Sequence, residues 1–203
     1  MKTTAVSFKS KIHIMTPKAF SRVPSGKYIY FFDDGKTREC IVKSTKFYTT
    51  GIKTCTGGGV QNGNEAIGFH LWDKLGVKSL KNKINKIKHS ISNITSGLVI
   101  GSKQLKSAPN SVPNFEYILQ ALQQECPNIS YFRTFKNPSS FADFKYNLNN
   151  DTWYIRLTAG AKKDVTNIEK LKQFFKEIYI APTDELLVDG QKVTVKDAPE
   201  FFC

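Results

Sequence analysis

The sequence is poor in the residues that build metal sites and read nucleic-acid bases. Its four cysteines include no CxxC pair and no zinc-ligand spacing, and three histidines are too few for a metal cluster. Arginine, the commonest base-reading residue, occurs only four times. No apolar stretch is long enough to span a membrane. We therefore expect no metal, no organic cofactor and no membrane span, and nucleic acid is a disfavoured partner. The cysteines are Cys40, Cys55, Cys126 and Cys203, and the histidines are His13, His70 and His89.

Length and composition are those of a soluble globular protein. The chain has 203 residues, of which 40% are hydrophobic and 12% aromatic, which suffices for one domain with a full core. Its net charge of +13 comes almost entirely from lysine and favours an acidic partner surface. The cysteine pattern predicts a reduced compartment. The N-terminus MKTTAVSFKSKIHIM has lysines where a signal peptide needs apolar residues, so any secretion is expected to follow a non-Sec route.

Hydrophobic periodicity predicts helices and strands along the whole chain. Helices are expected over 77–94, 113–126 and 165–180. Strands are expected over 27–32, 38–43, 45–49, 66–72, 97–101, 129–135, 142–148 and 152–158, with turns at 33–36 and 149–151 and a hairpin over 186–195. Together they predict a single α+β domain over 1–203, with a mixed, largely antiparallel β-sandwich core flanked by amphipathic helices.

The segment TTGIKTCTGGGVQNGNEAIGFHLW, residues 49–72, sets Cys55 against His70 fifteen residues later. The run Gly57–Gly59 predicts a tight turn or a close backbone approach after the cysteine. An adjacent strand over 66–72 would then carry the histidine back past the thiol. A thiol attacks as thiolate and needs a nearby cation or base, which an imidazole supplies. The pattern therefore indicates a nucleophile–base pair of Cys55 and His70.

The same residues also have structural interpretations. Cys55 is also typical of a small buried residue at a turn, and His70 of a core histidine bonded to backbone. Gly57–Gly59 is also typical of a flexible loop. Asp73 and Glu65, the carboxylates nearest to the histidine strand, are expected to be solvated turn residues.

The order of elements and the segment Ala66–Leu71 (AIGFHL) resemble the chemoreceptor glutamine deamidase superfamily. Its relatives include the catalytic domains of cytotoxic necrotizing factors and the Burkholderia lethal factor. Cys55 has the family's spacing to His70, and Thr49 falls where several members place an assisting threonine. The resemblance covers about residues 27–160, and the helix and hairpin over 164–195 are expected to be an extension. Lys53-Thr54 stands where the family has glycine and a small residue.

The resemblance implies hydrolysis of a glutamine side chain in a protein substrate. Cys55 would attack the amide, His70 would act as general base and acid, and Thr49 would orient the imidazole. Backbone N–H groups around Cys55, Thr56 and Gly57 would stabilise the oxyanion. No metal or organic cofactor is required. A bacterial effector or toxin, secreted into the host cytosol to act on a host protein, is the implied context.

The sequence leaves two alternatives open. The same thiol pair would serve a transglutaminase, in which an amine instead of water resolves the thioester. The lysines would suit a non-enzymatic basic module that binds nucleic acid, anionic lipid or an acidic protein. These lysines gather on or beside the helix predicted over 77–94, at Lys74, Lys78, Lys81, Lys83, Lys86 and Lys88.

Overall fold

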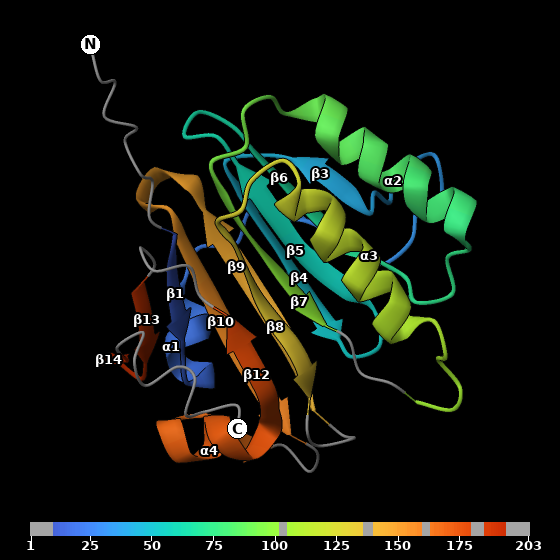
Figure 1. The fold of residues 1–203 in the computed structure, drawn as a ribbon. Helices are drawn as coiled ribbons and strands as arrows, with labels where there is room; N and C mark the ends of the chain where they lie inside the picture. Colours follow the sequence, from blue (N-terminus) through green and yellow to red (C-terminus); the bar gives the residue numbers. More distant parts are fainter. Residues whose placement is uncertain (1–9, 102–104, 136–139, 160–162, 180–184, 194–203) are drawn as a thin grey trace.

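The computed structural model describes residues 10–101, 105–135, 140–159, 163–179 and 185–193, which form two facing β-sheets with helices packed against them (Figure 1). Sheet A contains β1 (Lys11–Ile14), β2 (Lys27–Tyr28), β4 (Lys46–Ile52), β9 (Phe141–Asn147), β10 (Thr152–Ala159), β11 (Lys163–Asp164), β13 (Glu185–Val188) and β14 (Gln191–Val193). Sheet B contains β3 (Ile41–Lys43), β5 (Thr56–Gln61), β6 (Ala66–Leu71), β7 (Ser96–Gly101), β8 (Ile129–Phe135) and β12 (Phe175–Tyr179). The helices are α1 (Pro17–Arg22), α2 (Val77–Ser90), α3 (Ser111–Gln123) and α4 (Ile168–Phe174), with a 3-10 turn at Leu148–Asn150.

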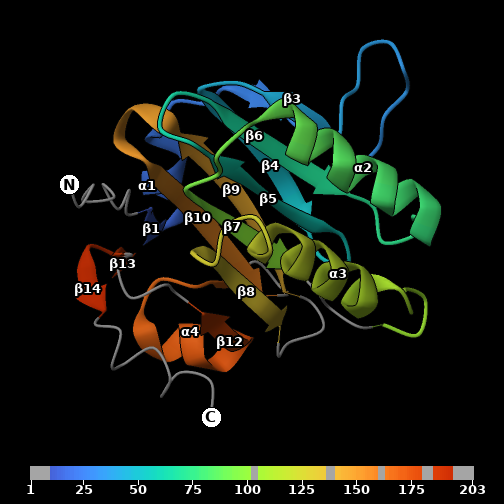
Figure 2. The same cartoon turned by 45° about the horizontal axis from the view of Figure 1, so that its top comes forward.

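Two hydrophobic cores lie on the two faces of sheet B. The core between the sheets contains Phe47 and Trp153 of sheet A and Leu98 of sheet B, all fully buried. The second core lies under α2 and α3, which run side by side over the outer face of sheet B (Figure 2). The predicted α+β class with a β-sandwich core flanked by amphipathic helices is therefore confirmed.

The glycine run Gly57–Gly59 forms the middle of strand β5 instead of the predicted turn. β5 pairs with β6 on one side and β7 on the other. A Cβ on Gly57 would lie 2.2 Å from Cδ1 of Ile52, and one on Gly59 would lie 2.4 Å from the carbonyl oxygen of Ile67. The prediction of a turn is wrong and that of a close backbone approach is confirmed, because the glycines let neighbouring groups pack directly on the strand.

The turn expected at 33–36 is present, with the N–H of Tyr30 donating to the carbonyl of Glu39 at 2.9 Å, but the strands that flank it belong to different sheets and form no regular hairpin. β2 pairs in parallel with β4 of sheet A, whereas β3 pairs with β6 of sheet B. The intervening loop is held by the Asp34 carboxylate, which accepts the main-chain N–H groups of Lys36, Thr37 and Arg38. A side chain that satisfies the backbone locally makes a compact loop without strand pairing.

The helix predicted over 165–180 is shorter than expected. Only Ile168–Phe174 is helical, and Phe175–Tyr179 joins the edge of sheet B beside β8. Pairing with an open sheet edge overrides the helical periodicity there. The hairpin over 186–195 is confirmed as far as Val193, with Asp189 and Gly190 at φ +50° and +78°; residues 194 and 195 lie outside the described part. The remaining predicted helices and strands are present within a few residues.

Gly59→Ala is expected to destabilise the protein by about 3 kcal/mol, the upper end for overpacking, because the added methyl would meet a fixed main-chain carbonyl. Equilibrium urea unfolding measures the change. Gly76→Ala is the matched control, since a Cβ there meets nothing within 4 Å. Equal losses in the two variants would contradict the close packing at β5.

Candidate active site

Cys55 and His70 lie at the same end of two neighbouring strands. The antiparallel register pairs Thr56 with Leu71 and Gly57 with His70, so Cys55 and Trp72 follow together at that end. Cys55 lies in the bend directly before β5, one residue outside the paired segment. The adjacent strand therefore carries the histidine back past the cysteine, as predicted. No described hydrogen bond joins the two side chains.

A hydrogen-bond relay across the sandwich orients the imidazole of His70. Oγ1 of Thr49, on β4, lies 2.8 Å from the carbonyl oxygen of Ile29 and 2.7 Å from Nδ1 of His70. The hydroxyl has one hydrogen, which it donates to the carbonyl, so it accepts from the imidazole. Nδ1 then carries the proton and Nε2 is a bare acceptor. The structure thus brings the predicted orienting residue Thr49 into contact with His70.

The imidazole is held neutral. His70 is 3% exposed, and burial lowers its pKa to about 4. Its Nε2 is buried and has no hydrogen-bond partner in the described part of the chain. A buried bare nitrogen with a fixed tautomer is suited to receive a proton from a group that enters beside it.

The thiol of Cys55 faces a carboxylate that the sequence interpretation placed in solvent. Sγ lies 3.9 Å from Oδ1 of Asp73, which is only 6% exposed. The expectation of a solvated Asp73 is wrong, because the loop after β6 folds back beside the cysteine. Glu65 is partly exposed and pairs with Lys43 at 2.6 Å, as befits a turn residue.

Burial raises the pKa of the Cys55 thiol to about 11, a main-chain hydrogen bond from Asp73 lowers it, and the Asp73 carboxylate charge raises it. Near neutral pH the thiol and the imidazole of His70 are therefore both uncharged. A reaction at Cys55 would require the base to remove the proton as the sulfur attacks, since no thiolate–imidazolium pair exists beforehand.

The first turn of α3 fixes the two loops that carry the thiol and the carboxylate. Oγ of Ser111 donates to the carbonyl of Thr54 at 2.6 Å. Nδ2 of Asn114 donates to the carbonyls of Asp73 and Leu75 at 3.1 and 3.3 Å. The sequence interpretation missed both residues. The available signal was their polar character on the face of α3 that is otherwise apolar.

Two of the predicted oxyanion donors lie within the sheet. Thr56 and Gly57 face residues on both β6 and β7, so their main-chain groups are directed at neighbouring strands. Cys55 precedes the paired segment, and a Cβ on Gly101 would lie 2.5 Å from its carbonyl oxygen. The N–H of Cys55 is therefore the one of the three predicted donors that lies outside the paired strand.

Comparison with protein-family models and with curated proteins finds no match. The resemblance to the deamidase superfamily therefore stays a prediction. Within the described ranges, no group of three or more His, Cys, Asp or Glu side chains is placed to hold a metal ion. The helices in those ranges are too short or too polar to cross a membrane.

Asp73→Asn is expected to speed alkylation of Cys55 at pH 7.5 several-fold. Removing the neighbouring negative charge lowers the thiol pKa, although burial keeps it above the ordinary value of about 8.5. The pH dependence of iodoacetamide labelling, with the other cysteines replaced by alanine, measures this pKa. Glu65→Gln is the charge-matched control and should leave the rate unchanged. An unaltered rate in Asp73→Asn would show that the carboxylate has no influence on the thiol.

Burial of neutral His70 is expected to make folding pH-dependent. The folded pKa of about 4 lies below the unfolded value, so unfolding takes up a proton at acid pH. Stability is full above about pH 6.5 and falls by about 3 kcal/mol as the pH drops to 4. Urea unfolding of wild type and His70→Gln across this range isolates the effect. Parallel pH profiles for the two proteins would contradict it.

Proposed function

We propose that the protein is a protein-glutamine deamidase that uses Cys55 as nucleophile and His70 as general base and acid. The observation that carries this proposal is the Thr49–His70 hydrogen bond, which leaves a bare, buried Nε2 at the strand end where Cys55 lies. A nucleophile, a base and an orienting group are the parts that thiol catalysis of amide hydrolysis requires. The resemblance of residues 49–72 to the deamidase superfamily supports the same assignment.

The reaction starts from two neutral groups. Nε2 of His70 takes the thiol proton while sulfur adds to the carboxamide carbon, and the N–H of Cys55 is the candidate donor to the oxyanion. The imidazolium then returns its proton to the nitrogen, ammonia departs, and a thioester remains. Water, deprotonated by the same imidazole, hydrolyses the thioester to glutamate and free thiol. Thr49 keeps the imidazole in one tautomer throughout.

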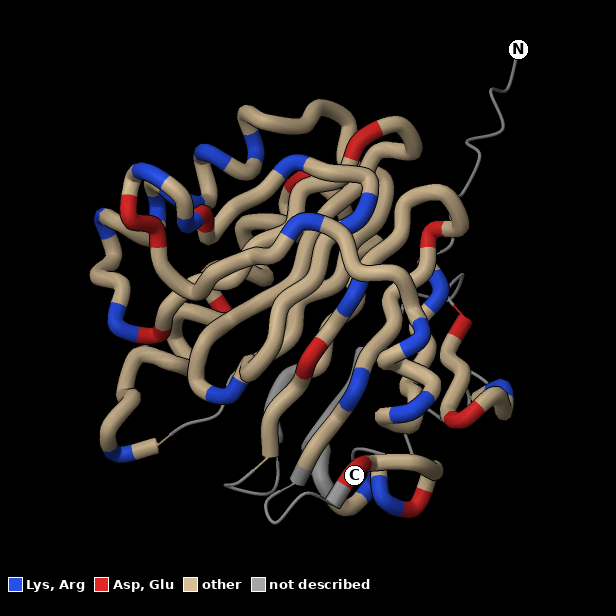
Figure 3. Tube along the Cα trace, turned by 180° about the vertical axis from the view of Figure 1, so that it is seen from behind, with Lys and Arg blue, Asp and Glu red and all other residues tan. Residues whose placement is uncertain are grey.

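The basic-module alternative receives less support. The buried face of α2 is apolar, as its spacing predicts, so its lysines form the solvent face. Lys83 pairs with Asp33 at 2.9 Å and Lys88 with Glu125 at 2.5 Å. Seen from behind, Lys and Arg are spread over the trace with Asp and Glu among them (Figure 3). This mixed distribution does not favour a nucleic-acid or lipid surface. The effector role rests on the family resemblance alone.

Wild-type protein incubated with a eukaryotic cell lysate is expected to release ammonia and to convert specific protein glutamines to glutamate. Mass spectrometry of the treated lysate locates these sites. Cys55→Ser and His70→Ala should lower the rate at least about 100-fold, because nucleophile and base are lost. Activity should persist down to about pH 5, since its acid limb follows the lowered pKa of His70.

Thr49 supplies a matched pair of controls for this experiment. Thr49→Ser keeps the hydroxyl and should retain most activity, whereas Thr49→Val should lose about 10-fold through the wrong tautomer. A fluorescent primary amine added to the lysate separates the two thioester fates, because its incorporation would identify a transglutaminase. Deamidation that is absent, or equal with Cys55→Ser, would refute the proposal.

A further inference from the structure

Three of the four exposed large apolar side chains in the described residues lie on segments that adjoin the candidate site in the chain or in space. Phe31 is 45% exposed, Trp72 38% and Val77 67%. The ring centroid of Phe31 lies 6.2 Å from the ring centroid of His70 and 6.2 Å from that of Trp72. Val77 begins α2, five residues after Trp72. These three side chains are called the site rim. Exposed apolar side chains gathered beside a reactive pair indicate a contact surface for another molecule.

The rim is held in place by the surrounding elements. Phe31 packs against Phe32 at 4.8 Å between ring centroids, and the loop that follows is anchored to α2 by the pair of Asp33 and Lys83 at 2.9 Å. The Asp73 carbonyl, next to Trp72, accepts Nδ2 of Asn114. Fixed aromatic side chains lose little conformational entropy on binding and make effective anchors.

Positive charge lies around the rim without described ion-pair partners. Lys53 precedes Cys55 by two residues, Lys74 stands 5.3 Å over the ring of Trp72, and Lys78 lies in the first turn of α2. All three are exposed. Asp33 is paired with Lys83, and Asp34 is engaged by main-chain N–H groups. Neither carboxylate of this loop forms a described ion pair with Lys53, Lys74 or Lys78.

We propose that the site rim binds an acidic segment of the protein substrate. An apolar side chain of that segment would lie against Phe31 and Trp72, and its carboxylates would face Lys53, Lys74 and Lys78. The target glutamine would then enter beside His70. This assignment rests on the proposed function and specifies the substrate class as glutamines flanked by an apolar residue and by acidic residues.

Binding can be tested without turnover in Cys55→Ser. The probe is a synthetic peptide with one glutamine between leucine and glycine and glutamates on both sides. The control peptide has lysine at each glutamate position. Fluorescence anisotropy gives the affinities, and acrylamide quenching of Trp72 should fall on binding, since Trp153 is fully buried. We expect the acidic peptide to bind, the lysine peptide not to bind, and affinity to fall with added salt.

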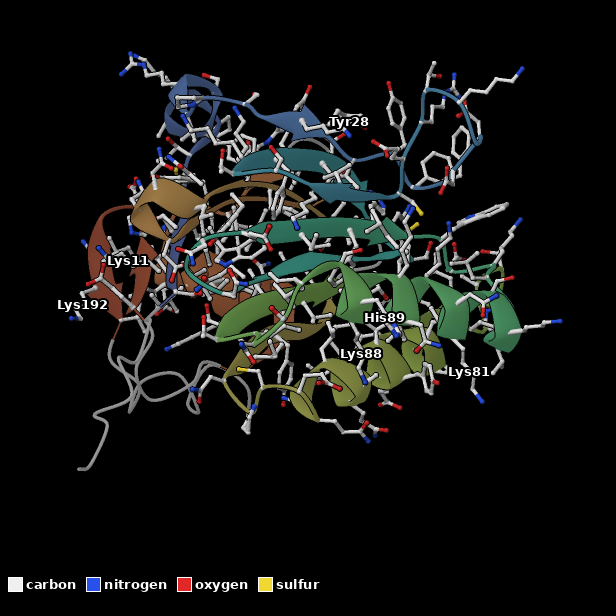
Figure 4. The ribbon with its side chains drawn as sticks, turned by 90° about the horizontal axis from the view of Figure 1, so that it is seen from above. Lys11, Tyr28, Lys81, Lys88, His89 and Lys192 are labelled. Carbon is white, nitrogen blue, oxygen red and sulfur yellow. The ribbon has the colours of Figure 1, made fainter. Side chains whose placement is uncertain are left out.

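Charge reversal locates the bound peptide. Lys53→Glu, Lys74→Glu and Lys78→Glu combined should weaken binding at least about 10-fold, because carboxylates would then face carboxylates. The control with the same charge change combines Lys11→Glu, Lys18→Glu and Lys192→Glu, which are also exposed, and of which Lys192 pairs with Glu185 at 3.7 Å. Lys11 and Lys192 lie on the opposite side of the molecule from Lys81 of α2 (Figure 4). This control should leave binding within about twofold.

The possible outcomes distinguish failure of the rim proposal from failure of the deamidase proposal. Equal binding of the two peptides, equal weakening by the two triple variants, or no binding at millimolar peptide would overturn the acidic-segment assignment. Rim-dependent binding of anionic vesicles or RNA in preference to the acidic peptide would overturn it as well. Lysate deamidation at glutamines without acidic neighbours would reject the rim proposal and leave the deamidase standing. Selective peptide binding without lysate deamidation would reject the deamidase proposal and leave the rim as a site that binds acidic peptides.

Discussion

Side chains of sheet A rest directly on glycine backbone of sheet B, and this contact sets how closely the two sheets approach. A Cβ on Gly59 would lie 2.9 Å from Phe47 and 3.0 Å from Trp153, and one on Gly57 would meet Ile52 and Phe144. Protein interiors pack to such density only where shapes match. The close approach brings β4 near enough for its threonine hydroxyl to reach the imidazole on β6. The orientation of the imidazole therefore depends on residues that have no side chain.

The low-dielectric interior explains why the thiol and the imidazole are both neutral. Burial disfavours the charged form of each group, so it shifts the two pKa values in opposite directions. A protonated thiol is a poor target for oxidants, because oxidation proceeds through the thiolate. The Cys55 thiol is thus protected from oxidation near neutral pH.

Local signals predicted the parts of the fold that local chemistry decides. The apolar strand around His70, the amphipathic helix at Val77–Ser90 and the hairpin at Asp189-Gly190 all follow from periodicity or turn preference. Long-range packing decided the rest. The glycine run became a strand because it is enclosed by β6 and β7, and Phe175–Tyr179 became a strand because a sheet edge was open. Asp73 was missed because its burial depends on α3, which lies far along the chain.

The three residues of the relay from Ile29 through Thr49 to His70 are not equally recognisable in an amino-acid sequence. Threonine and histidine contribute side chains, so a relative that kept the arrangement would show a hydroxyl residue and an imidazole at these positions. Ile29 contributes only its carbonyl, and every amino acid provides one. Its part in fixing the proton on Nδ1 would leave no signature in an alignment, however many relatives were compared. The path of the main chain therefore helps to set the protonation state of His70 without requiring a particular side chain at position 29.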